Sequence, residues 1–234
     1  MSQIPAPCRA CDARLHGICG ALDATQQTVL ARSSTRRSLS PGSALINEAQ
    51  PVDRYAVILS GAVKLTKSLS DGREQIVGLQ FSPDFLGRPF QEESIVTAQT
   101  ATAVVLCSFP RKTFESLIMQ SLLLENRLLR QTLSELDASR SWMLTLGRKT
   151  AQEKVASYLL LIAERCCVDG VQGSEPLSFD LPMSRLEIAD YLGLTIETVS
   201  RQLSKLRAEG IIALRQSRHL QLIDPVRLKV RSGT

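Results

Sequence analysis

Residues 181–212, LPMSRLEIADYLGLTIETVSRQLSKLRAEGII, have the pattern of two short helices joined by a tight turn. Ser184 and Glu187 form a capping box that begins the first helix. Gly193 supplies the left-handed residue that the turn needs, and Thr195 can cap the second helix. A short helix, a glycine turn and a second helix make up a helix-turn-helix, although an ordinary helical hairpin has the same outline.

The predicted second helix has a polar and basic face. Glu197, Ser200, Arg201 and Lys205 recur at three- and four-residue intervals, so they lie on one side of a helix. Arginine can bond O6 and N7 of guanine, glutamate can accept from cytosine N4, and serine is short enough to sit against a base edge. We interpret these residues as the ones that enter the major groove of double-stranded DNA. The alternative is a solvated charged face.

A short hairpin is predicted directly after these helices. In residues 211–224, IIALRQSRHLQLID, two apolar strands flank a tight polar turn that carries Arg215 and Arg218. Arginines at such a tip can contact DNA phosphates, which position a protein without reading sequence. The whole segment therefore predicts a winged helix-turn-helix.

The composition is compatible with this interpretation. The chain has 234 residues, 44% of them hydrophobic, and a net charge of +5. A mildly basic balance permits nucleic-acid binding without requiring it. No apolar run reaches the length of about 18 residues that spans a membrane, and the N-terminus lacks an apolar signal region, so we expect a cytoplasmic protein. The two histidines, His16 and His219, stand in no nucleophile context, which argues against an enzyme.

Residues 36–110 predict short strands with turns between them. Residues 55–68, YAVILSGAVKLTKS, predict a hairpin at Ser60-Gly61, and Asp71-Gly72 predicts the next turn. Strands at this spacing indicate a small barrel or roll. Residues 1–20 lack an amphipathic period, and we expect them to be ordered by what they bind.

A long helix is predicted between the roll and the helix-turn-helix. Seven-residue spacing relates Leu122, Leu129, Leu136 and Met143, and Leu128 and Leu133 widen that face. Such a repeat is typical of a coiled-coil seam, so we expect a homodimer. Three of the four positions that follow each seam residue by three are polar, so the seam should be weak. The alternative is a helix that packs on its own roll.

Roll, long helix and winged helix-turn-helix in this order resemble the CRP/FNR family of bacterial transcription regulators. Ile196-Glu197-Thr198-Val199-Ser200-Arg201 looks like the reading helix of the FNR branch. The resemblance implies an α+β fold with a cyclic-nucleotide-binding-like jelly roll, homodimers on TTGAT-type palindromes, and RNA polymerase as a partner. The expected domains are residues 1–20 for the cysteine-rich segment, 21–112 for the roll, 113–147 for the dimerisation helix and 148–234 for the DNA-binding domain.

The roll departs from the nucleotide-binding pattern of that family. Members that bind cyclic nucleotides have a Gly-Glu pair for the ribose and an Arg-Ser or Arg-Thr pair for the phosphate. Here Arg88 follows Gly87, and residues 94–97 offer no cation. A buried phosphate needs a paired charge. We therefore expect no cyclic nucleotide.

Six cysteines in a reducing compartment favour metal binding or redox chemistry over disulfides. Cys8, Cys11, Cys19 and Cys107 are similar in order and place to the cluster ligands of the FNR branch, although the second gap is two residues longer than in one common variant. The resemblance implies a [4Fe–4S] cluster and an anaerobic activator that responds to oxygen. Cys166 and Cys167, at the end of an apolar helix, are expected to be buried and inert.

Other interpretations of the cysteines stay open. Four cysteines can also bind zinc, which often uses a C-x2-C pair, and His16 is a conceivable ligand, although a solvated loop histidine is the simpler reading. The thiols can also stay unligated. The corresponding alternatives for function are a cluster-free, FixK-like regulator and a zinc- or thiol-based redox sensor with the same fold.

Overall fold

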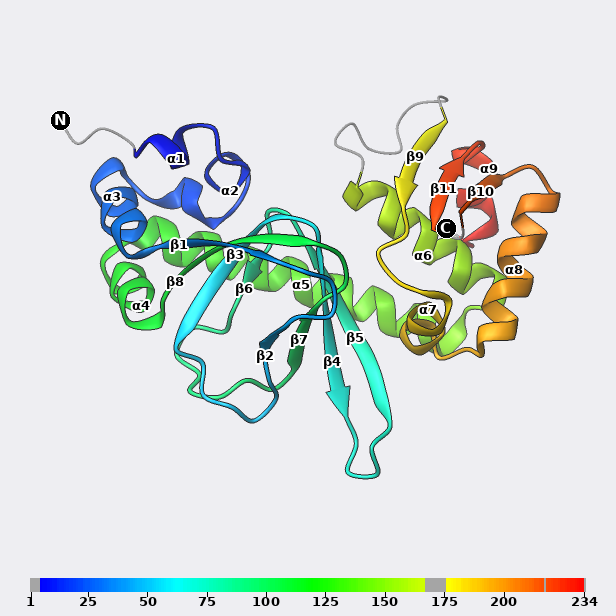
Figure 1. Cartoon of the computed structure of the whole chain (residues 1–234), viewed down its shortest axis with the longest axis horizontal. Helices are drawn as coiled ribbons and strands as arrows, with labels where there is room; N and C mark the ends of the chain where they lie inside the picture. Colours follow the sequence, from blue (N-terminus) through cyan, green and yellow to red (C-terminus); the bar gives the residue numbers. More distant parts are fainter. Residues whose placement is uncertain (1–4, 167–175, 217, 234) are drawn as a thin grey trace. The chain divides into compact units, whose positions relative to one another are not determined.

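The computed structural model describes residues 5–166, 176–216 and 218–233. The chain divides into two compact units, Met1–Leu136 and Asp137–Thr234. Figure 1 shows the strands of a β-roll in the first unit and a small sheet with helices in the second, which confirms the expected α+β class. No helix in the described part of the chain combines the length and the apolarity that crossing a membrane requires.

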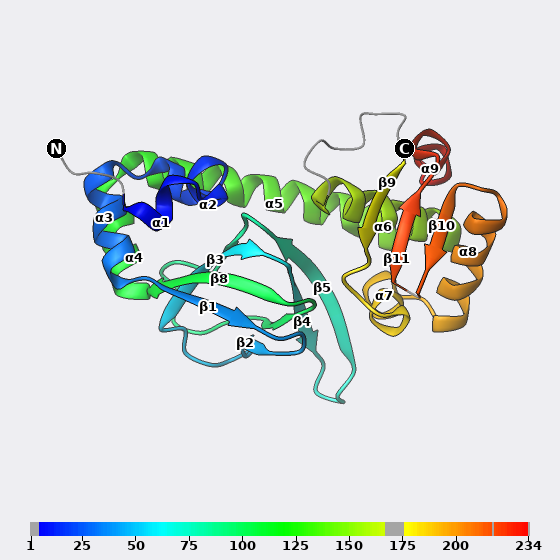
Figure 2. The same cartoon turned by 45° about the horizontal axis from the view of Figure 1, so that its top comes forward.

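The β-roll consists of two four-stranded antiparallel sheets. One sheet has the order β1-β8-β3-β6 and the other β2-β7-β4-β5. Figure 2 shows β1 and β8 side by side, as their pairing requires. The strands are β1 Thr35–Leu39, β2 Ala44–Ile46, β3 Arg54–Ser60, β4 Ala62–Ser68, β5 Glu74–Phe81, β6 Phe85–Leu86, β7 Thr97–Thr100 and β8 Val104–Pro110.

The hairpin predicted at Ser60-Gly61 is wrong. β3 pairs with β6 and β8, whereas β4 pairs with β5 and β7, so the chain changes sheets at Gly61. Gly61 has a φ of 86°, and a Cβ atom there would lie 2.2 Å from the main-chain oxygen of Ala103. The glycine is therefore needed for a tight crossover, which gives the same local signal as a hairpin turn. The turn at Asp71-Gly72 does join the paired strands β4 and β5, as predicted.

The cysteine-rich segment is folded onto the core of the roll. Its short helices are α1 Ala6–Arg9, α2 Asp12–Leu15 and the 3₁₀ helix η1 Ile18–Ala21. Ala13 and Ile18 are buried in the same core as Phe109 and Phe114. These two apolar side chains anchor the segment to the roll, and its expected dependence on a ligand stays a prediction. Helix α3, Ala24–Ser33, follows, with Asp23 in a capping box.

The long helix predicted over residues 113–147 is interrupted. Helix α4 covers Arg111–Gln120 and α5 covers Leu122–Arg148, with Ser121 extended between them at a φ of −132°. The hydroxyl of Ser121 accepts a hydrogen bond from the main-chain N–H of Leu124 at 3.3 Å. Serine favours helix starts over helix interiors because its side chain competes for such donors. The two compact units meet inside α5, between Leu136 and Asp137, which differs from the predicted limit after residue 147.

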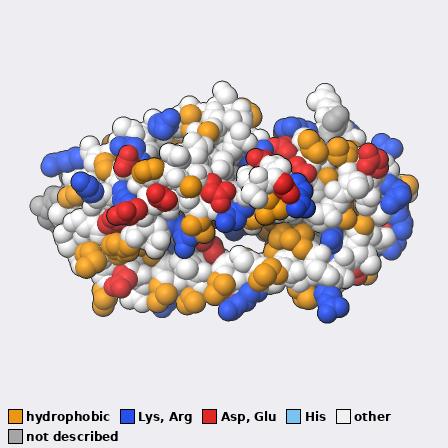
Figure 3. All heavy atoms as spheres, turned by 90° about the horizontal axis from the view of Figure 1, so that it is seen from below, with side chains coloured by type: hydrophobic (Ala, Val, Ile, Leu, Met, Phe, Trp, Pro, Cys, Tyr) orange, Lys and Arg blue, Asp and Glu red, His pale blue; other side chains and the backbone are white. Residues whose placement is uncertain are grey.

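The heptad residues of α5 lie on its exposed side. Leu122, Leu129, Leu136 and Met143 are between 43% and 73% exposed. Leu124 is buried in the core of the first unit, and Leu128 packs against that core instead of widening the exposed face. The seam and the packing face are therefore two different sides of one helix. Figure 3 shows apolar side chains at the surface among charged ones.

The second unit contains the last turns of α5 and a winged helix-turn-helix. Its other elements are α6 Ala151–Cys166, β9 Leu177–Asp180, α7 Arg185–Leu192, α8 Ile196–Ala208, β10 Ile212–Arg215, β11 His219–Leu222 and α9 Pro225–Arg231. Strand β9 was not expected; it extends the β10-β11 hairpin to a three-stranded sheet. The ring of Trp142 stacks on that of Tyr191 with their centroids 4.5 Å apart, so the end of α5 is packed against α7.

Candidate metal centre and nucleic-acid interface

Four cysteines line one cavity in the first unit. Cys8 lies on α1, Cys11 caps the start of α2, Cys19 lies on η1 and Cys107 lies on β8. All four border a cavity of about 240 Å³, and each thiol is partly accessible. The structure thus brings together the residues predicted as one ligand set, although Cys107 comes from a distant strand.

Local hydrogen bonds fix the loop that carries the first three cysteines. The main-chain oxygen of Cys11 accepts from the N–H of Arg14 at 2.9 Å, and that of Cys19 accepts from Nε2 of Gln27 at 3.2 Å. A Cβ atom on Gly20 would lie 2.5 Å from the main-chain oxygen of Arg14. The turn therefore closes only with glycine beside Cys19, which holds this thiol toward the cavity wall.

The thiols influence one another electrostatically. Burial, together with the neighbouring Cys107, Cys11 and Cys8, raises the pKa of Cys19 to about 12. Burial also raises the pKa of Cys107, whereas the hydrogen bond from Ser34 and the positive charge of Arg36 lower it. Without a ligand, the thiols of Cys19 and Cys107 therefore keep their protons near pH 7, and a bound metal group has to displace them.

The geometry of the thiols bears on which metal group fits. Among the described residues, no group of three or more His, Cys, Asp or Glu side chains is close enough to hold a metal ion. A zinc ion needs sulfurs about 2.3 Å from a common centre. Here the four thiols border a cavity of about 240 Å³. That donor set suits a polynuclear iron–sulfur cluster, which is ligated by four separated thiolates.

His16 does not border this cavity. Its side chain is exposed, and its main-chain oxygen accepts a hydrogen bond from Arg127 of α5. The solvated loop histidine is therefore the interpretation that agrees with the structure. Cys166 is exposed, so its predicted burial is wrong: it follows the buried Ile162 by one helical turn, but it is the last residue of α6. Cys167 lies outside the described residues.

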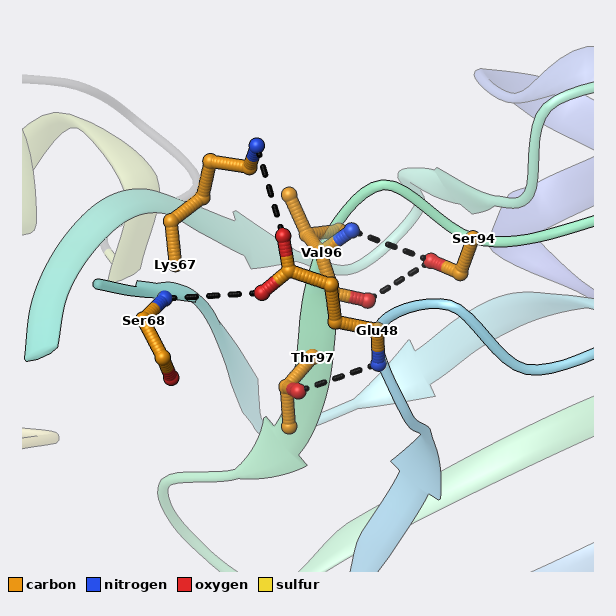
Figure 4. A network of polar contacts seen from close by, with 6 residues as sticks. All are labelled: Glu48, Lys67, Ser68, Ser94, Val96 and Thr97. Atoms are coloured by element: carbon orange, nitrogen blue, oxygen red, sulfur yellow. Dashed lines mark hydrogen bonds and ion pairs between the residues drawn. The ribbon is translucent and has the colours of Figure 1, made fainter. Parts of the chain in front are cut away.

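Residues 94–97, the stretch that offers no cation for a phosphate, take part in the polar network drawn in Figure 4. The carboxylate of Glu48 pairs with Nζ of Lys67 at 3.3 Å and accepts from the N–H of Ser68 at 3.4 Å. The hydroxyl of Ser94 donates to the main-chain oxygen of Val96 at 2.6 Å and accepts from its N–H at 3.2 Å. The N–H of Glu48 donates to the hydroxyl of Thr97 at 3.1 Å, so a carboxylate lies beside this stretch instead of a cation.

Gly87 has a packing role at the end of β6. Its φ is 154°, and a Cβ atom would lie 2.4 Å from the ring of Tyr55. The hydroxyl of Tyr55 donates to Glu115 at 2.7 Å, and the main-chain N–H of Phe90 donates to the same carboxylate oxygen at 2.7 Å. The loop after β6 is therefore tied to α4 through Glu115.

The helix-turn-helix follows the local signals of its sequence. Ser184 and Glu187 form the capping box of α7, and Gly193 ends that helix in the left-handed region with a φ of 60°. Thr195 caps α8 by accepting from the N–H of Thr198. Val199, Leu203 and Leu206 form the buried side of α8, and the opposite side of the helix faces solvent.

The predicted DNA-reading residues are all exposed. Glu197, Ser200, Arg201 and Lys205 lie on the solvent side of α8. Nζ of Lys205 donates to Gln152 of α6 at 2.9 Å, so this cation is bonded within the unit. Glu197, Ser200 and Arg201 occupy the first two turns, the part of a reading helix that contacts bases.

The wing carries its two arginines at the turn between β10 and β11. Arg215 and Arg218 are exposed, and Ser217 between them lies outside the described residues. The main-chain oxygen of Arg218 accepts from the N–H of Leu181 at 2.9 Å, which holds the wing against the start of the helix-turn-helix. Beside it, Nδ1 of His219 lies 2.9 Å from Asp180.

Sequence reasoning missed the non-cysteine residues of the cavity. Arg14, Gln27, Ser34 and Arg36 border it together with the thiols. Arg36 lies directly opposite Cys107 in the register of β1 and β8. That pairing joins two strands far apart in the chain, so only the sheet order reveals it. Arg14 follows Cys11 by three residues, a helical spacing that the sequence does display.

Two families match this chain. Residues 36–121 match the family described as the cyclic nucleotide-binding domain, and residues 153–231 match the Crp-like helix-turn-helix domain. A probable transcriptional activator of Rhizobium leguminosarum bv. viciae is 48% identical over 94% of this chain and 90% of its own length. The transcriptional activator protein FnrL of Cereibacter sphaeroides is 41% identical over 97% and 92%.

Solved structures give the same result. FixK2 from Bradyrhizobium japonicum superposes with a TM-score of 0.78 at 33% identity, over 86% of this chain and 98% of that one. The expectation of a regulator and not an enzyme is confirmed by these relatives. The chain therefore belongs to the CRP/FNR family of DNA-binding transcription regulators and is similar to its FnrL- and FixK-type activators.

Proposed function

We propose that this chain is an oxygen-responsive transcription activator that binds DNA as a homodimer while Cys8, Cys11, Cys19 and Cys107 hold a [4Fe–4S] cluster. The observation that carries this proposal is the convergence of the four thiols on one cavity. The size of this cavity, and the lack of three or more described His, Cys, Asp or Glu side chains placed to hold a single ion, favour a cluster over zinc. When bound, the cluster supplies the oxygen-sensitive group of the protein.

Contacts of the cysteine segment supply a route from the cavity to the dimer helix. Ile18 shares a buried core with Leu124 of α5, and Arg127 bonds the main chain at His16. Four ligated cysteines fix the segment between β8 and this first part of α5. Release of the thiols removes the link between this segment and Cys107 of β8 and leaves the apolar anchor of Ala13 and Ile18 alone, so the contacts with α5 weaken.

The exposed heptad face of α5 is the proposed dimer seam. Leu122, Leu129, Leu136 and Met143 would meet the same residues of a second copy, and this burial stabilises the dimer. A dimer presents two copies of α8 about one DNA turn apart, which matches a palindromic site. A weak seam is one that a modest change in α5 can switch.

Glu197, Ser200 and Arg201 are the proposed base-reading residues on TTGAT-type half-sites. Their exposure on the first turns of α8 supports this assignment. Lys205, Arg215 and Arg218 are proposed to meet phosphates. RNA polymerase is the proposed protein partner, and the cytoplasm the proposed location. The carboxylate of Glu48 in the roll supports the absence of a cyclic nucleotide.

A cluster-free regulator is the second candidate. FixK2, which is 33% identical to this chain, shares its fold. DNA binding of such a protein would not depend on oxygen. A zinc-based sensor with the same fold has less support, because no three of the described His, Cys, Asp or Glu side chains are placed to hold one metal ion. A thiol-based redox sensor is the remaining alternative.

Binding of a fluorescent TTGAT palindrome, measured first without oxygen and then after exposure to air, separates these candidates. The proposed function predicts that affinity falls at least tenfold in air and returns after anaerobic reconstitution with iron and sulfide. Equal binding in both conditions by a colourless protein would favour the cluster-free candidate. A scrambled duplex of equal length controls for nonspecific binding.

A further inference from the structure

The cavity of the four cysteines would hold a strongly anionic group, and it offers a specific source of positive charge. Four thiolates around a [4Fe–4S] core of charge about +2 leave a net charge of about −2. Its wall is largely apolar, with Ala13, Leu22, Leu30 and Leu59 among the bordering residues. Charge placed against such a wall is costly unless it is paired.

Two arginines border the cavity, and none of its described lining residues is acidic. Arg36 lies directly opposite Cys107 in the antiparallel pair of β1 and β8. Directly opposite residues project from the same face of a sheet, so Arg36 and Cys107 share the cavity side. Arg37, the next residue, projects from the other face and does not border the cavity.

Arg14 reaches the cavity from α2 and also holds the first pair of cysteines. Its Nε donates to the main-chain oxygen of Cys8 at 3.0 Å, and its Nη2 donates to that of Arg9 at 2.9 Å. Both acceptors are uncharged carbonyl oxygens. The guanidinium therefore clasps the loop between Cys8 and Cys11 while keeping its positive charge for the cavity.

We propose that Arg14 and Arg36 neutralise the anionic cluster and set its reduction potential, Arg36 by its charge and Arg14 by its charge and by clasping the Cys8 loop. This inference rests on the proposed function, because it requires a cluster on the four cysteines. Net charge near a cluster is one of the factors that determine its reduction potential. A positive charge favours the form that carries one more electron, so it raises that potential.

The test compares anaerobically reconstituted wild-type protein with Arg36→Gln, Arg36→Lys and Arg37→Gln, using the cluster potential measured by direct electrochemistry. Arg36→Gln should shift the potential to more negative values. Arg36→Lys, which keeps the charge, should stay near wild type. Arg37→Gln removes the same charge from the neighbouring residue on the other face of β1, so it should shift the potential much less. Circular dichroism and iron content confirm that each variant is folded and loaded.

Arg14→Lys tests separately whether the hydrogen bonds of Arg14 hold the loop that carries Cys8. It keeps the charge but loses the two-pronged contact with the main chain of Cys8 and Arg9. Its potential should stay near wild type, while iron and sulfide uptake during reconstitution should become slower. Equal uptake rates for Arg14→Lys and wild type would show that the hydrogen bonds of Arg14 to Cys8 and Arg9 do not assist cluster assembly.

Two failures are distinguishable. If wild-type protein takes up no iron and sulfide, the proposed function fails. If wild type is loaded and Arg36→Gln and Arg37→Gln have the same potential, the proposed function stands and the role of Arg36 is overturned.

Discussion

Arg127 on α5 donates a hydrogen bond from Nη2 to the main-chain oxygen of His16, between Cys11 and Cys19. One turn earlier, Leu124 is buried in the same core as Ile18. The loop that carries the cysteines and the start of the dimer helix are thus joined by a polar and an apolar contact within the first unit. A change in that loop has a direct path to α5.

Replacing Arg127 with alanine should weaken this link. We expect Arg127→Ala to load iron like wild type, because it does not border the cavity. The difference in dimerisation between loaded and air-exposed protein, measured by anaerobic sedimentation, should shrink. Arg130→Ala, one turn further along the exposed surface of α5, is the control. The link has no role in switching if both variants respond to air as wild type does.

A charge in the seam should disrupt the dimer. Leu129→Glu would place an unpaired carboxylate against the second copy, so dimerisation and DNA affinity should fall together while cluster loading is unchanged. Ser134→Glu adds the same charge on the other side of the exposed helix and should leave both unchanged. Sedimentation of Leu129→Glu that matches wild type would mean that the heptad face is not the seam.

Base reading and phosphate contact should respond differently to mutation. Arg201→Ala should cost about 1–3 kcal/mol per half-site and relax specificity at the guanine position. Arg215→Ala or Arg218→Ala should weaken binding to all sequences alike and flatten the dependence of affinity on salt. Fluorescence anisotropy with TTGAT and scrambled duplexes at several salt concentrations checks both. An equal loss of affinity for both duplexes in Arg201→Ala would make Arg201 a phosphate contact.

The stability of the roll should depend on the ionisation of Glu115. Burial tends to raise the pKa of this carboxyl, but hydrogen bonds from Tyr55 and Phe90 and the Arg111 guanidinium lower it below its ordinary value. A lowered pKa in the folded protein means stability that is present above the unfolded pKa, about 4.3, and is lost as pH falls through the folded pKa.

Glu115→Gln should therefore be less stable than wild type at pH 7, by an amount on the order of 1 kcal/mol. The difference in the free energy of unfolding between Glu115→Gln and wild type should narrow as pH falls below about 4.3. Denaturant unfolding at pH 7 and pH 3.5 measures it, with Glu125→Gln on the exposed side of α5 as the control. A gap of constant size across this range would show that the charge of Glu115 does not matter.

The parts of the fold that were predicted correctly depend on local signals. The capping box at Ser184 and the left-handed turn at Gly193 are set by residues within one helical turn, so the sequence displays them directly. Gly61 shows the limit of this approach. A glycine with positive φ serves a hairpin or a crossover equally well, and only the pairing of distant strands decides between them.

The cavity shows the same contrast. Three of its cysteines stand close together in the sequence, and the fourth was placed through a resemblance to a known family. Arg36 had no signal of its own, because its position beside Cys107 depends on the register of β1 with β8. The break at Ser121 was missed because a single serine within a periodic apolar pattern does not reveal whether it caps a helix or continues one.

Iron and sulfide content of anaerobically purified Cys107→Ser tests the central claim most directly. Wild type should be brown and contain about four iron and about four sulfide per chain. Cys107→Ser should lose this content, as should serine at Cys8, Cys11 or Cys19, because each removes one thiolate from the cavity. Cys166→Ser, an exposed cysteine on α6, should retain it. Full iron and sulfide in Cys107→Ser, or a wild-type protein that takes up neither, would contradict the assignment.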